Sequence, residues 1–261
     1  MNSSDTVLFK VDQGVGVVTF NRPEKHNAFN DEMSAAMGSI IELALSHVDV
    51  RCVLIRGNGP SFSSGRDTTQ LGQRPSGESD FEFVQRAQRT RMLILDSPKP
   101  TVVEMRGFAL GGACELALSG DIRVADISVQ LAFPEVRYGI AVDTGGSALA
   151  TALAGPSKAK YLMMTGERID AATALAWNLV DFVVPPDELE ARARTIAQRL
   201  ADNAPLAVQM SKQLVDNVWA GSVRAAMRSE LMAQTALFTS RDRAEVGAAR
   251  AEGRPPEFTG R

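Results

Sequence analysis

The feature that most constrains the fold is the alternation of β-branched runs with helix-periodic segments along the first half of the chain. Apolar residues at spacings of three and four after Asp31 predict a helix with Asn30 as its N-cap. Short apolar runs at 7–10, 15–20, 52–55 and 101–105 predict strands, and residues 83–95 predict a second helix. Strands that alternate with helices predict an α/β layered architecture rather than a β-sandwich.

The pattern changes after about residue 157, where helical periodicity takes over. We predict helices at 157–165, 170–178, 189–202, 205–219 and 222–239, with one short strand at 182–184. The apolar stripes of the last helices, which include Leu214 and Val218, must be covered by the core or by another subunit. Arg254-Pro255-Pro256 marks an irregular tail.

Composition narrows the class of protein. The chain has 261 residues, of which 44% are hydrophobic, and a net charge of −3, so we expect a compact protein that binds neither nucleic acid nor anionic membranes. It has no apolar stretch of about 18 residues, as a membrane span needs, and no leader pattern, so we expect a cytoplasmic protein. Two histidines argue against a His-based metal site, and Cys52 and Cys114 are expected to be buried thiols.

Several common catalytic motifs are missing. The G-x-G-x-x-G pattern fails at Gly57-Asn58-Gly59 because the third glycine is absent, and no Gly-Lys dipeptide exists for a Walker A loop. No G-x-S-x-G motif occurs, and His26 and His47 give a Ser-His-Asp triad few options. Nucleotide-cradling loops of these kinds and serine hydrolase chemistry are therefore not expected.

Two glycine-rich turns each follow a predicted strand and lead into a helix start. They are Ser-Phe-Ser-Ser-Gly-Arg-Asp at 61–67 and Gly-Phe-Ala-Leu-Gly-Gly-Ala-Cys-Glu-Leu at 107–116. Such a turn presents free backbone N–H groups at the positive end of a helix dipole, so two of them side by side can bind one oxyanion. Either turn alone also fits a tight connection packed against a sheet, and it is the pairing that indicates a site.

Three carboxylates lie beside these apolar, glycine-rich segments. Glu115 stands at the start of a helix, where it also fits a residue that stabilises the helix dipole. Glu135 follows Phe-Pro at 133–134, and Asp143 precedes Gly-Gly at 145–146, where it also fits the N-cap of a helix over 145–153. Together the three acids indicate candidate acid/base groups.

The order of these motifs resembles a known family. The chain carries Asn-Arg-Pro at 21–23, Asn-Ala at 27–28, the two turns, Asp-Ile-Arg at 121–123, Pro-Glu at 134–135 and Gly-Gly at 145–146. In this order they resemble the enoyl-CoA hydratase/isomerase (crotonase) superfamily, and the resemblance covers nearly the whole chain. The motifs are specific for the superfamily but not for one reaction, because its members share acyl-CoA thioester chemistry and differ in where protons move.

The resemblance implies a fold and a site. It implies a crotonase-like spiral of ββα turns over residues 1–195, which holds the acyl-CoA site, and a C-terminal helical region over 196–261 that builds a homotrimer or a dimer of trimers. Coenzyme A would be part of the substrate, with no separate cofactor and no metal. The oxyanion-hole donors would be the backbone N–H groups of Arg66 and Gly112, and the catalytic acids Glu115 and Glu135. Further substrate or coenzyme A contacts would come from Ala28, Ser64, Asp67, Thr68, Thr69 and Gly111.

The reaction that fits best is reversible addition of water to an enoyl-CoA, a step of the fatty-acid β-oxidation type. Negative charge must collect on the thioester oxygen as an enolate, and preorganised donors stabilise such charge by roughly 3 to 4 kcal/mol each. Two carboxyl groups can share the proton transfers if one is ionised and the other protonated. A second class of function is an acyl-CoA-binding protein without catalysis, for which ligand binding without turnover would speak.

Asp143 departs from the hydratase pattern, which usually has glycine there. Dienoyl-CoA isomerases and carnitinyl-CoA dehydratases resemble this chain in having an aspartate at that position, so Glu135 and Asp143 also fit an isomerase acid/base pair. Asp143 can instead recognise a polar substrate group. Dienoyl isomerases usually have Asp where this chain has Glu115, so a dehydratase-type variant is the closer match.

Two further segments bear on the substrate. The Gly/Pro/Ser-rich stretch 71–79 is expected to be a mobile loop that shapes the acyl pocket. Arg86, Arg89 and Arg91 form a compact basic cluster, which we interpret as a solvated helix face, with a phosphate contact to coenzyme A as the weaker alternative.

Overall fold

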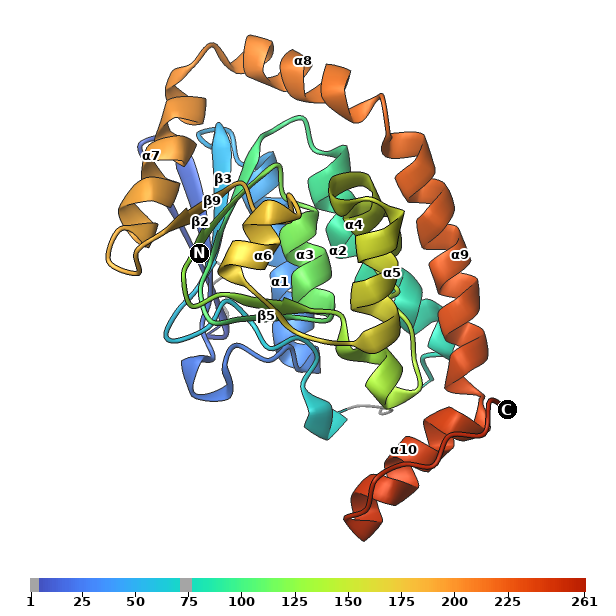
Figure 1. Ribbon diagram of the computed structural model, residues 1–261. Helices are drawn as coiled ribbons and strands as arrows, with labels where there is room; N and C mark the ends of the chain where they lie inside the picture. Colours follow the sequence, from blue (N-terminus) through green and yellow to red (C-terminus); the bar gives the residue numbers. More distant parts are fainter. Residues whose placement is uncertain (1–4, 71–76) are drawn as a thin grey trace.

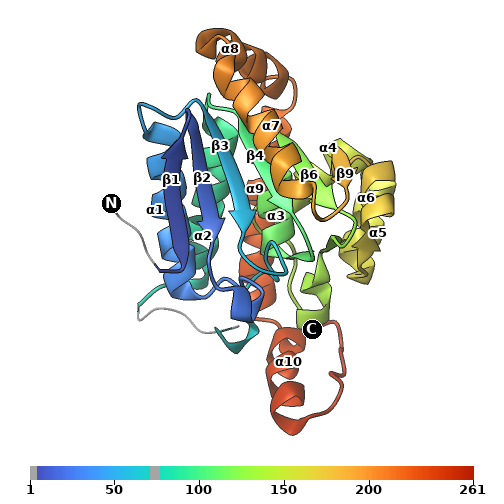
Figure 2. The same ribbon diagram turned by 90° about the vertical axis from the view of Figure 1, so that its left-hand side faces the viewer.

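The main sheet of the protein has six strands in the order β1-β2-β3-β4-β6-β9 (Figures 1 and 2). A computed structural model describes residues 5–70 and 77–261. The strands are β1 (Val7–Asp12), β2 (Val15–Phe20), β3 (Cys52–Gly57), β4 (Thr101–Met105), β6 (Ile122–Asp126) and β9 (Phe182–Val184). Only the opening β1–β2 pair is antiparallel; the others run parallel, which explains why β2 and β4 are buried along their full lengths.

A second, smaller sheet consists of β5 (Phe108–Leu110), β7 (Gln130–Ala132) and β8 (Ile169–Asp170). The chain passes from β4 to β5 and then into α3 (Gly112–Leu118), and from β6 to β7 and then into η3 (Pro134–Tyr138) and α4 (Gly146–Ala154). Each passage takes one strand from each sheet and then a helix. This repeated strand–strand–helix turn confirms the predicted α/β fold of ββα turns.

Helices cover both faces of the main sheet. On one face α1 (Asp31–Ser46) packs Met33, Met37 and Ile41 into the core that also holds α2 (Asp80–Asp96) and α3. On the other face α7 (Leu189–Asp202) contributes Leu189 and three alanines to a separate apolar cluster. Figure 2 shows the sheet between these layers. The alternation of side chains along β2 and β3 supplies both clusters.

Side chains cap the N-termini of α1 and α2. The side chain of Asn30 accepts a hydrogen bond of 2.9 Å from the Met33 N–H and caps α1, as predicted. Ser79 and Glu82 form a capping box, so α2 begins at Asp80, three residues before the predicted start. Of the predicted loop 71–79, residues 71–76 lie outside the described residues. Cys52 and Cys114 are buried and unpaired, as predicted.

The later part of the chain is helical, as predicted. Its helices are α5 (Pro156–Thr165), α6 (Ala171–Ala176), α8 (Pro205–Asp216), α9 (Ala220–Phe238) and α10 (Arg241–Glu252), and η1 (Pro23–Lys25) and η2 (Thr68–Gln70) are short 3₁₀ turns nearer the N-terminus. The helix α10 was not predicted. Its apolar periodicity is weak, and Ala249 is its only buried residue. The side chain of Ser240 nevertheless caps its start.

The last helices differ in what they cover. The expected domain boundary at residue 195 lies inside α7, which packs on the main sheet, so α8 is the first helix to leave the core (Figure 1). No residue of α8 is buried, whereas α9 returns to pack along α2 and α4. Within the described residues, no helix is both long and apolar enough to cross a membrane.

Candidate active site

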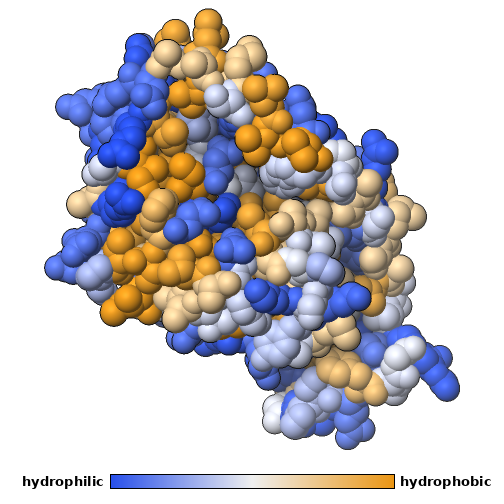
Figure 3. Space-filling model, turned by 45° about the horizontal axis from the view of Figure 1, so that its top comes forward, coloured by the Kyte–Doolittle hydropathy of each residue, from blue (hydrophilic) through white to orange (hydrophobic). Residues whose placement is uncertain are grey.

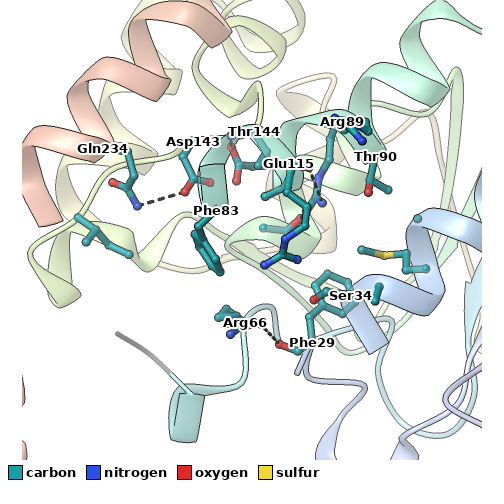
Figure 4. Close-up of a pocket in the computed structure, with 18 of the residues that line it drawn as sticks. Phe29, Ser34, Arg66, Phe83, Arg89, Thr90, Glu115, Asp143, Thr144 and Gln234 are labelled. Atoms are coloured by element: carbon teal, nitrogen blue, oxygen red, sulfur yellow. Dashed lines mark hydrogen bonds between the residues drawn. The ribbon is translucent and has the colours of Figure 1, made fainter. Parts of the chain in front are cut away.

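The three predicted acids meet at one cavity of about 360 Å³ between α1, α2, the start of α3 and α9. Glu115, Glu135 and Asp143 line it together with Arg66 and Gly112. Figure 4 shows Glu115, Asp143 and Arg66 around this cavity. These residues come from three separate glycine- or proline-containing turns and one helix. The sequence positions span 77 residues, and the ββα topology brings them together.

The two glycine-rich turns lie against each other at one end of this cavity. Ser63 and Ala109 form a β-bridge between the turns, and a Cβ atom added to Gly65 would collide with the Leu110 carbonyl and lie 3.8 Å from the Gly112 nitrogen. Gly65 and Gly111 adopt φ angles of +83° and +56°, which favour glycine. Among the described residues, neither the Arg66 N–H nor the Gly112 N–H has an acceptor.

The Arg66 side chain points away from the reaction centre. Its Nη2 donates to Asp31 at 2.6 Å, and its guanidinium lies 5.5 Å from the centre of the Phe83 ring. Only the backbone N–H of Arg66 is therefore available beside that of Gly112, which agrees with a role for the amide rather than the side chain. The resulting pair of free donors is suited to an oxyanion.

Glu115 is held at the start of α4. Its side chain projects from α3, is 1% exposed, and accepts hydrogen bonds of 2.9 Å each from the Thr144 and Gly146 N–H groups through Oε1. A Cβ atom on Gly146 would come within 2.8 Å of that oxygen, so only glycine fits there. Glu115 also lies in the first turn of α3, so the interpretation as a dipole-stabilising residue stays open, but its Oε1 binds the start of α4.

Glu135 has a different environment. It sits in the η3 turn after Pro134, its Oε1 faces Gly111, and its Oε2 has no hydrogen-bond partner in the described chain. Burial, followed by the nearby Glu115 carboxylate, raises the pKa of Glu135 well above its ordinary value. Its environment therefore favours the protonated form of Glu135 more than that of an exposed glutamate.

Asp143 faces the same cavity and does not cap a helix. The N-cap of α4 is Gly145, so the alternative N-cap interpretation of Asp143 is wrong. The side chain of Gln234 on α9 instead donates to Asp143 at 3.2 Å (Figure 4). Burial, then the charge of Glu115, raises the pKa of Asp143 to about 8, although Arg91 opposes this change.

Arg91 is buried, which corrects the interpretation of the basic cluster as a solvated face. It is 4% exposed, its Nη2 donates to the Gly112 carbonyl at 2.5 Å, and its Nε has no hydrogen-bond partner in the described residues. Arg86 is paired with Glu78, and Arg89 is exposed. Arg91 supplies the one buried cation beside Glu115 and Asp143 in the described part of the chain.

A second cavity of about 160 Å³ adjoins the first. The two share Arg66, Gly112 and Glu135, so the free N–H groups stand where one cavity meets the other. Three of the predicted contact residues, Ser64, Thr68 and Gly111, line the second cavity, as do Arg137 and Arg168. Both residues that carry a free N–H group therefore line both cavities.

The remaining predicted contact residues are engaged within the protein. The Ala28 carbonyl accepts from Arg22 at 2.5 Å. The Asp67 carboxylate accepts from the backbone and hydroxyl of Thr69 and pairs with Arg22 at 3.3 Å. These bonds, above all the one to the Thr69 hydroxyl, lower the pKa of Asp67 against the opposing effect of burial. Substrate contact by Ala28, Asp67 and Thr69 stays a prediction.

Sequence analysis missed three polar residues around the site. Gln88 on α2 donates at 2.7 Å to the carbonyls of Asp143 and Met227, Gln234 accepts from the Ala141 N–H at 2.9 Å, and Glu230 on α9 accepts from the start of α4. All three are under 10% exposed. A usable signal was present on α2, where Gln88 and Arg91 occupy the same helical face as the buried Val84 and Ile94.

The buried acids do not form a metal centre. In the ranges 5–70 and 77–261 no group of three His, Cys, Asp or Glu residues is arranged to hold a metal ion. The arrangement instead combines two free N–H donors, one carboxyl with two N–H donors on it, and two carboxyls with raised pKa values. Chemically, it can stabilise an oxyanion and move protons beside it.

Comparisons with known proteins agree with this geometry. Residues 10–261 match the family model described as enoyl-CoA hydratase/isomerase. The chain is 33% identical to a short-chain-enoyl-CoA hydratase of Clostridium acetobutylicum, with 97% of both chains covered, and 30% identical to a 1,2-epoxyphenylacetyl-CoA isomerase of Escherichia coli, with 98% of both covered. A crystal structure of an enoyl-CoA hydratase/isomerase from Pseudoalteromonas atlantica superposes with a TM-score of 0.88 at 30% identity, covering 97% of this chain and 100% of the other.

Proposed function

The chain belongs to the enoyl-CoA hydratase/isomerase family, and from that premise we propose that it is an enoyl-CoA hydratase. It would add water reversibly across the 2,3 double bond of an enoyl-CoA thioester. The observation that carries this proposal is the pair Glu115 and Glu135, two buried carboxyls in different environments beside two free N–H donors.

The oxyanion hole stabilises the developing enolate. The thioester oxygen accepts hydrogen bonds from the Arg66 and Gly112 N–H groups, at the point where the two cavities meet. The acyl chain then extends into the larger cavity, and the coenzyme A part leaves through the smaller one, past Ser64 and Gly111. Donors fixed by backbone geometry need no reorganisation as charge develops on the oxygen.

The two glutamates divide the proton transfers. Glu115 takes one proton from a water molecule through Oε2, because Oε1 is occupied by two N–H donors, and the water oxygen forms its bond to C3. The π electrons of the double bond move to the thioester oxygen as the enolate forms. Protonated Glu135 then gives its proton to C2, and the thioester carbonyl is restored. The proton on Glu115 returns to Glu135 before the next turnover, so the net change is the addition of one water.

We further propose that the chain assembles as a homotrimer or a dimer of trimers. The helix α8 supports this, because its Leu206 and Leu214 are 71% and 72% exposed and no residue of α8 is buried; Val218, just after the helix, is 85% exposed. A cavity of about 980 Å³ lies beneath α8, and Figure 3 shows apolar surface around a hollow on this side of the molecule. Apolar surface of this extent is typical of an interface.

The hydratase proposal is tested with crotonyl-CoA. Loss of the conjugated-thioester absorbance reports consumption of the double bond, and mass spectrometry identifies the product. We expect a gain of one water that both Glu115→Gln and Glu135→Gln abolish, with unchanged secondary structure and acyl-CoA binding. Acyl-CoA binding without turnover by the wild-type chain would instead favour the non-catalytic alternative.

A second candidate function uses Asp143. Its carboxyl faces the same cavity as Glu135, and its raised pKa suits a group that carries a proton at neutral pH. A dienoyl-CoA isomerase or a carnitinyl-type dehydratase would use such a group. If crotonyl-CoA gains no water, a panel of dienoyl-CoA and hydroxylated acyl-CoA substrates distinguishes these reactions, and Asp143→Gly must then remove the activity.

A further inference from the structure

Four consecutive backbone N–H groups at the start of α4 are divided between two carboxylates. Glu115 from α3 accepts those of Thr144 and Gly146, at 2.9 Å each. Glu230 from α9 accepts those of Gly145 at 2.6 Å and Ser147 at 2.9 Å, and also the Ser147 hydroxyl at 2.5 Å. Two helices distant in sequence therefore hold alternate N–H groups of a third.

This arrangement replaces an ordinary helix cap. The first N–H groups of a helix have no partner within it, and a side chain at the N-cap usually accepts one of them. The N-cap of α4 is Gly145, which has no side chain to do so. The directions of the Thr144 and Gly146 N–H groups toward Glu115 thus depend on what holds Gly145 and Ser147, and that is Glu230.

We infer that Glu230 is a positioning residue for Glu115. By fixing Gly145 and Ser147, it keeps the two intervening donors aligned on Oε1 of Glu115 and leaves Oε2 free on the side of Gly112. Glu230 is 6% exposed and does not line the cavity, so it acts through α4 and not on the substrate. The catalytic consequence rests on the proposed hydratase function; the structural consequence does not.

Glu230 also adds charge behind the site. The charged groups that interact with it are Glu115 on α3, Glu135 on η3 and Asp143 before α4. Arg91 on α2 interacts with two of these acids, Glu115 and Asp143. Burial, followed by the charge of Glu115, raises the pKa of Glu230 itself. In its ionised form Glu230 contributes to the raised pKa of Glu135, behind burial, Glu115 and Asp143, and to that of Asp143, behind burial and Glu115. Removing its charge therefore lowers both pKa values, which a purely structural residue would not do.

The test compares Glu230→Gln with Glu190→Gln. Glu190 is exposed, pairs with Arg56 and lies at the start of α7, so the control makes the same chemical change away from α4. We expect Glu230→Gln to lower kcat for crotonyl-CoA by about tenfold or more at nearly unchanged KM. The alkaline limb of its pH–rate profile should move to lower pH, because the proton donor loses its proton more readily. A kcat and profile equal to those of Glu190→Gln would overturn the inference.

Residue-resolved amide hydrogen exchange gives a readout that needs no turnover. If Glu230 positions the whole segment, Glu230→Gln must speed exchange at Thr144 and Gly146, which it does not touch, as well as at Gly145 and Ser147. Faster exchange at Gly145 and Ser147 alone overturns the inference. A wild-type chain that fails to hydrate crotonyl-CoA overturns the proposed function but leaves this test intact.

A milder variant covers the case in which Glu230→Gln does not fold. Ser147→Ala removes one of the three donors to Glu230 and keeps the carboxylate charge. We expect a drop in kcat of a few-fold, faster exchange at Thr144 and Gly146, and no shift of the alkaline limb. Unchanged kcat together with unchanged exchange at these two amides would count against Glu230 as a positioning residue.

Discussion

The two walls of the active-site cavity are built in different ways. One wall consists of backbone N–H groups on the two glycine-rich turns, where Gly65 and Gly111 leave no room for a side chain. Another wall consists of side chains, chiefly Asp143 with Gln234 from α9 (Figure 4). The buried Arg91 from α2 adds a positive charge and reaches the Gly112 carbonyl of the backbone wall. In the proposed function the backbone wall would stabilise charge on any thioester, whereas the effect of the side-chain wall depends on which side chains it carries.

The difference shows where chemistry and selectivity reside. Backbone donors are the same for every residue type, so the turns must be conserved in shape and not in polarity. In the side-chain wall a single substitution can change the pKa values of several acids, because these acids are buried close together and influence one another through their charges. Substitutions in the first wall should remove all activity, and those in the second should alter it.

The largest effect is expected for Gly65→Ala. The new Cβ would collide with the Leu110 carbonyl and displace the Arg66 N–H, so kcat should fall by about 10²–10³ for every substrate. Gly155→Ala is a matched control, because Gly155 has a similar φ of +82° but nothing within 4 Å of the added Cβ. Equal losses in both variants, measured as kcat with CD spectra, would assign the effect to backbone strain alone.

The next effect concerns Asp143 and pH. Folding raises the pKa of this acid from an ordinary value near 4 to about 8, so the folded state binds the proton more tightly and stability is lost as pH rises from about 4 to about 8. Asp143→Asn removes this loss and can still accept from Gln234. We expect a gain of on the order of 2–4 kcal/mol at pH 8 and little gain at pH 4.

Thermal or urea unfolding of both proteins at pH 4, 6 and 8 checks this expectation. The difference in unfolding free energy must grow with pH across the series. A constant difference would mean that Asp143 keeps an ordinary pKa, and the side-chain wall would then be charged at neutral pH.

A smaller effect is expected for Gln234→Ala on α9. It removes the hydrogen bonds to Asp143 and to the Ala141 N–H, which should cost about 1–2 kcal/mol of stability and reduce kcat a few-fold. Gln213→Ala on α8 makes the same change at an exposed residue and should alter the unfolding free energy by less than about 0.5 kcal/mol. If the two variants behave alike in unfolding and kinetics, α9 does not support the loop.

The smallest effect is expected for Arg66→Ala. The backbone N–H remains, and the side chain loses its pair with Asp31, its contact with Phe83 and a weak hydrogen bond of 3.4 Å to the Phe29 carbonyl. We expect kcat within about threefold of wild type and a stability loss of at most about 1 kcal/mol. A loss as large as that of Gly65→Ala would show that the Arg66 side chain, and not its amide, serves the backbone wall.

The sequence was informative about the backbone wall and much less about the side-chain wall. Local glycine patterns predict the turns at 61–67 and 107–116. The spacing of apolar residues predicts α1 and α7, because a helix that packs on a sheet buries residues with a regular period. Gln234 and Glu230 lie about 90 residues from the loop that they hold, and no local pattern encodes that distance. Arg91 was misjudged because a charge on a helix is usually solvated, whereas this side chain is buried and donates to the Gly112 carbonyl at the start of α3.

The exposure of α8 predicts that the activity of the protein depends on its concentration. The apolar side chains of α8 are exposed, and the chain continues from α8 through Trp219 into α9, which carries Glu230 and Gln234. If copies of the chain cover α8 in the assembly proposed above, association contributes to stability by mass action, about 2.7 kcal/mol at a hundredfold excess over the dissociation constant. Specific activity should then fall with protein concentration in very dilute assays, because losing a neighbour loosens the helix that aligns Glu115.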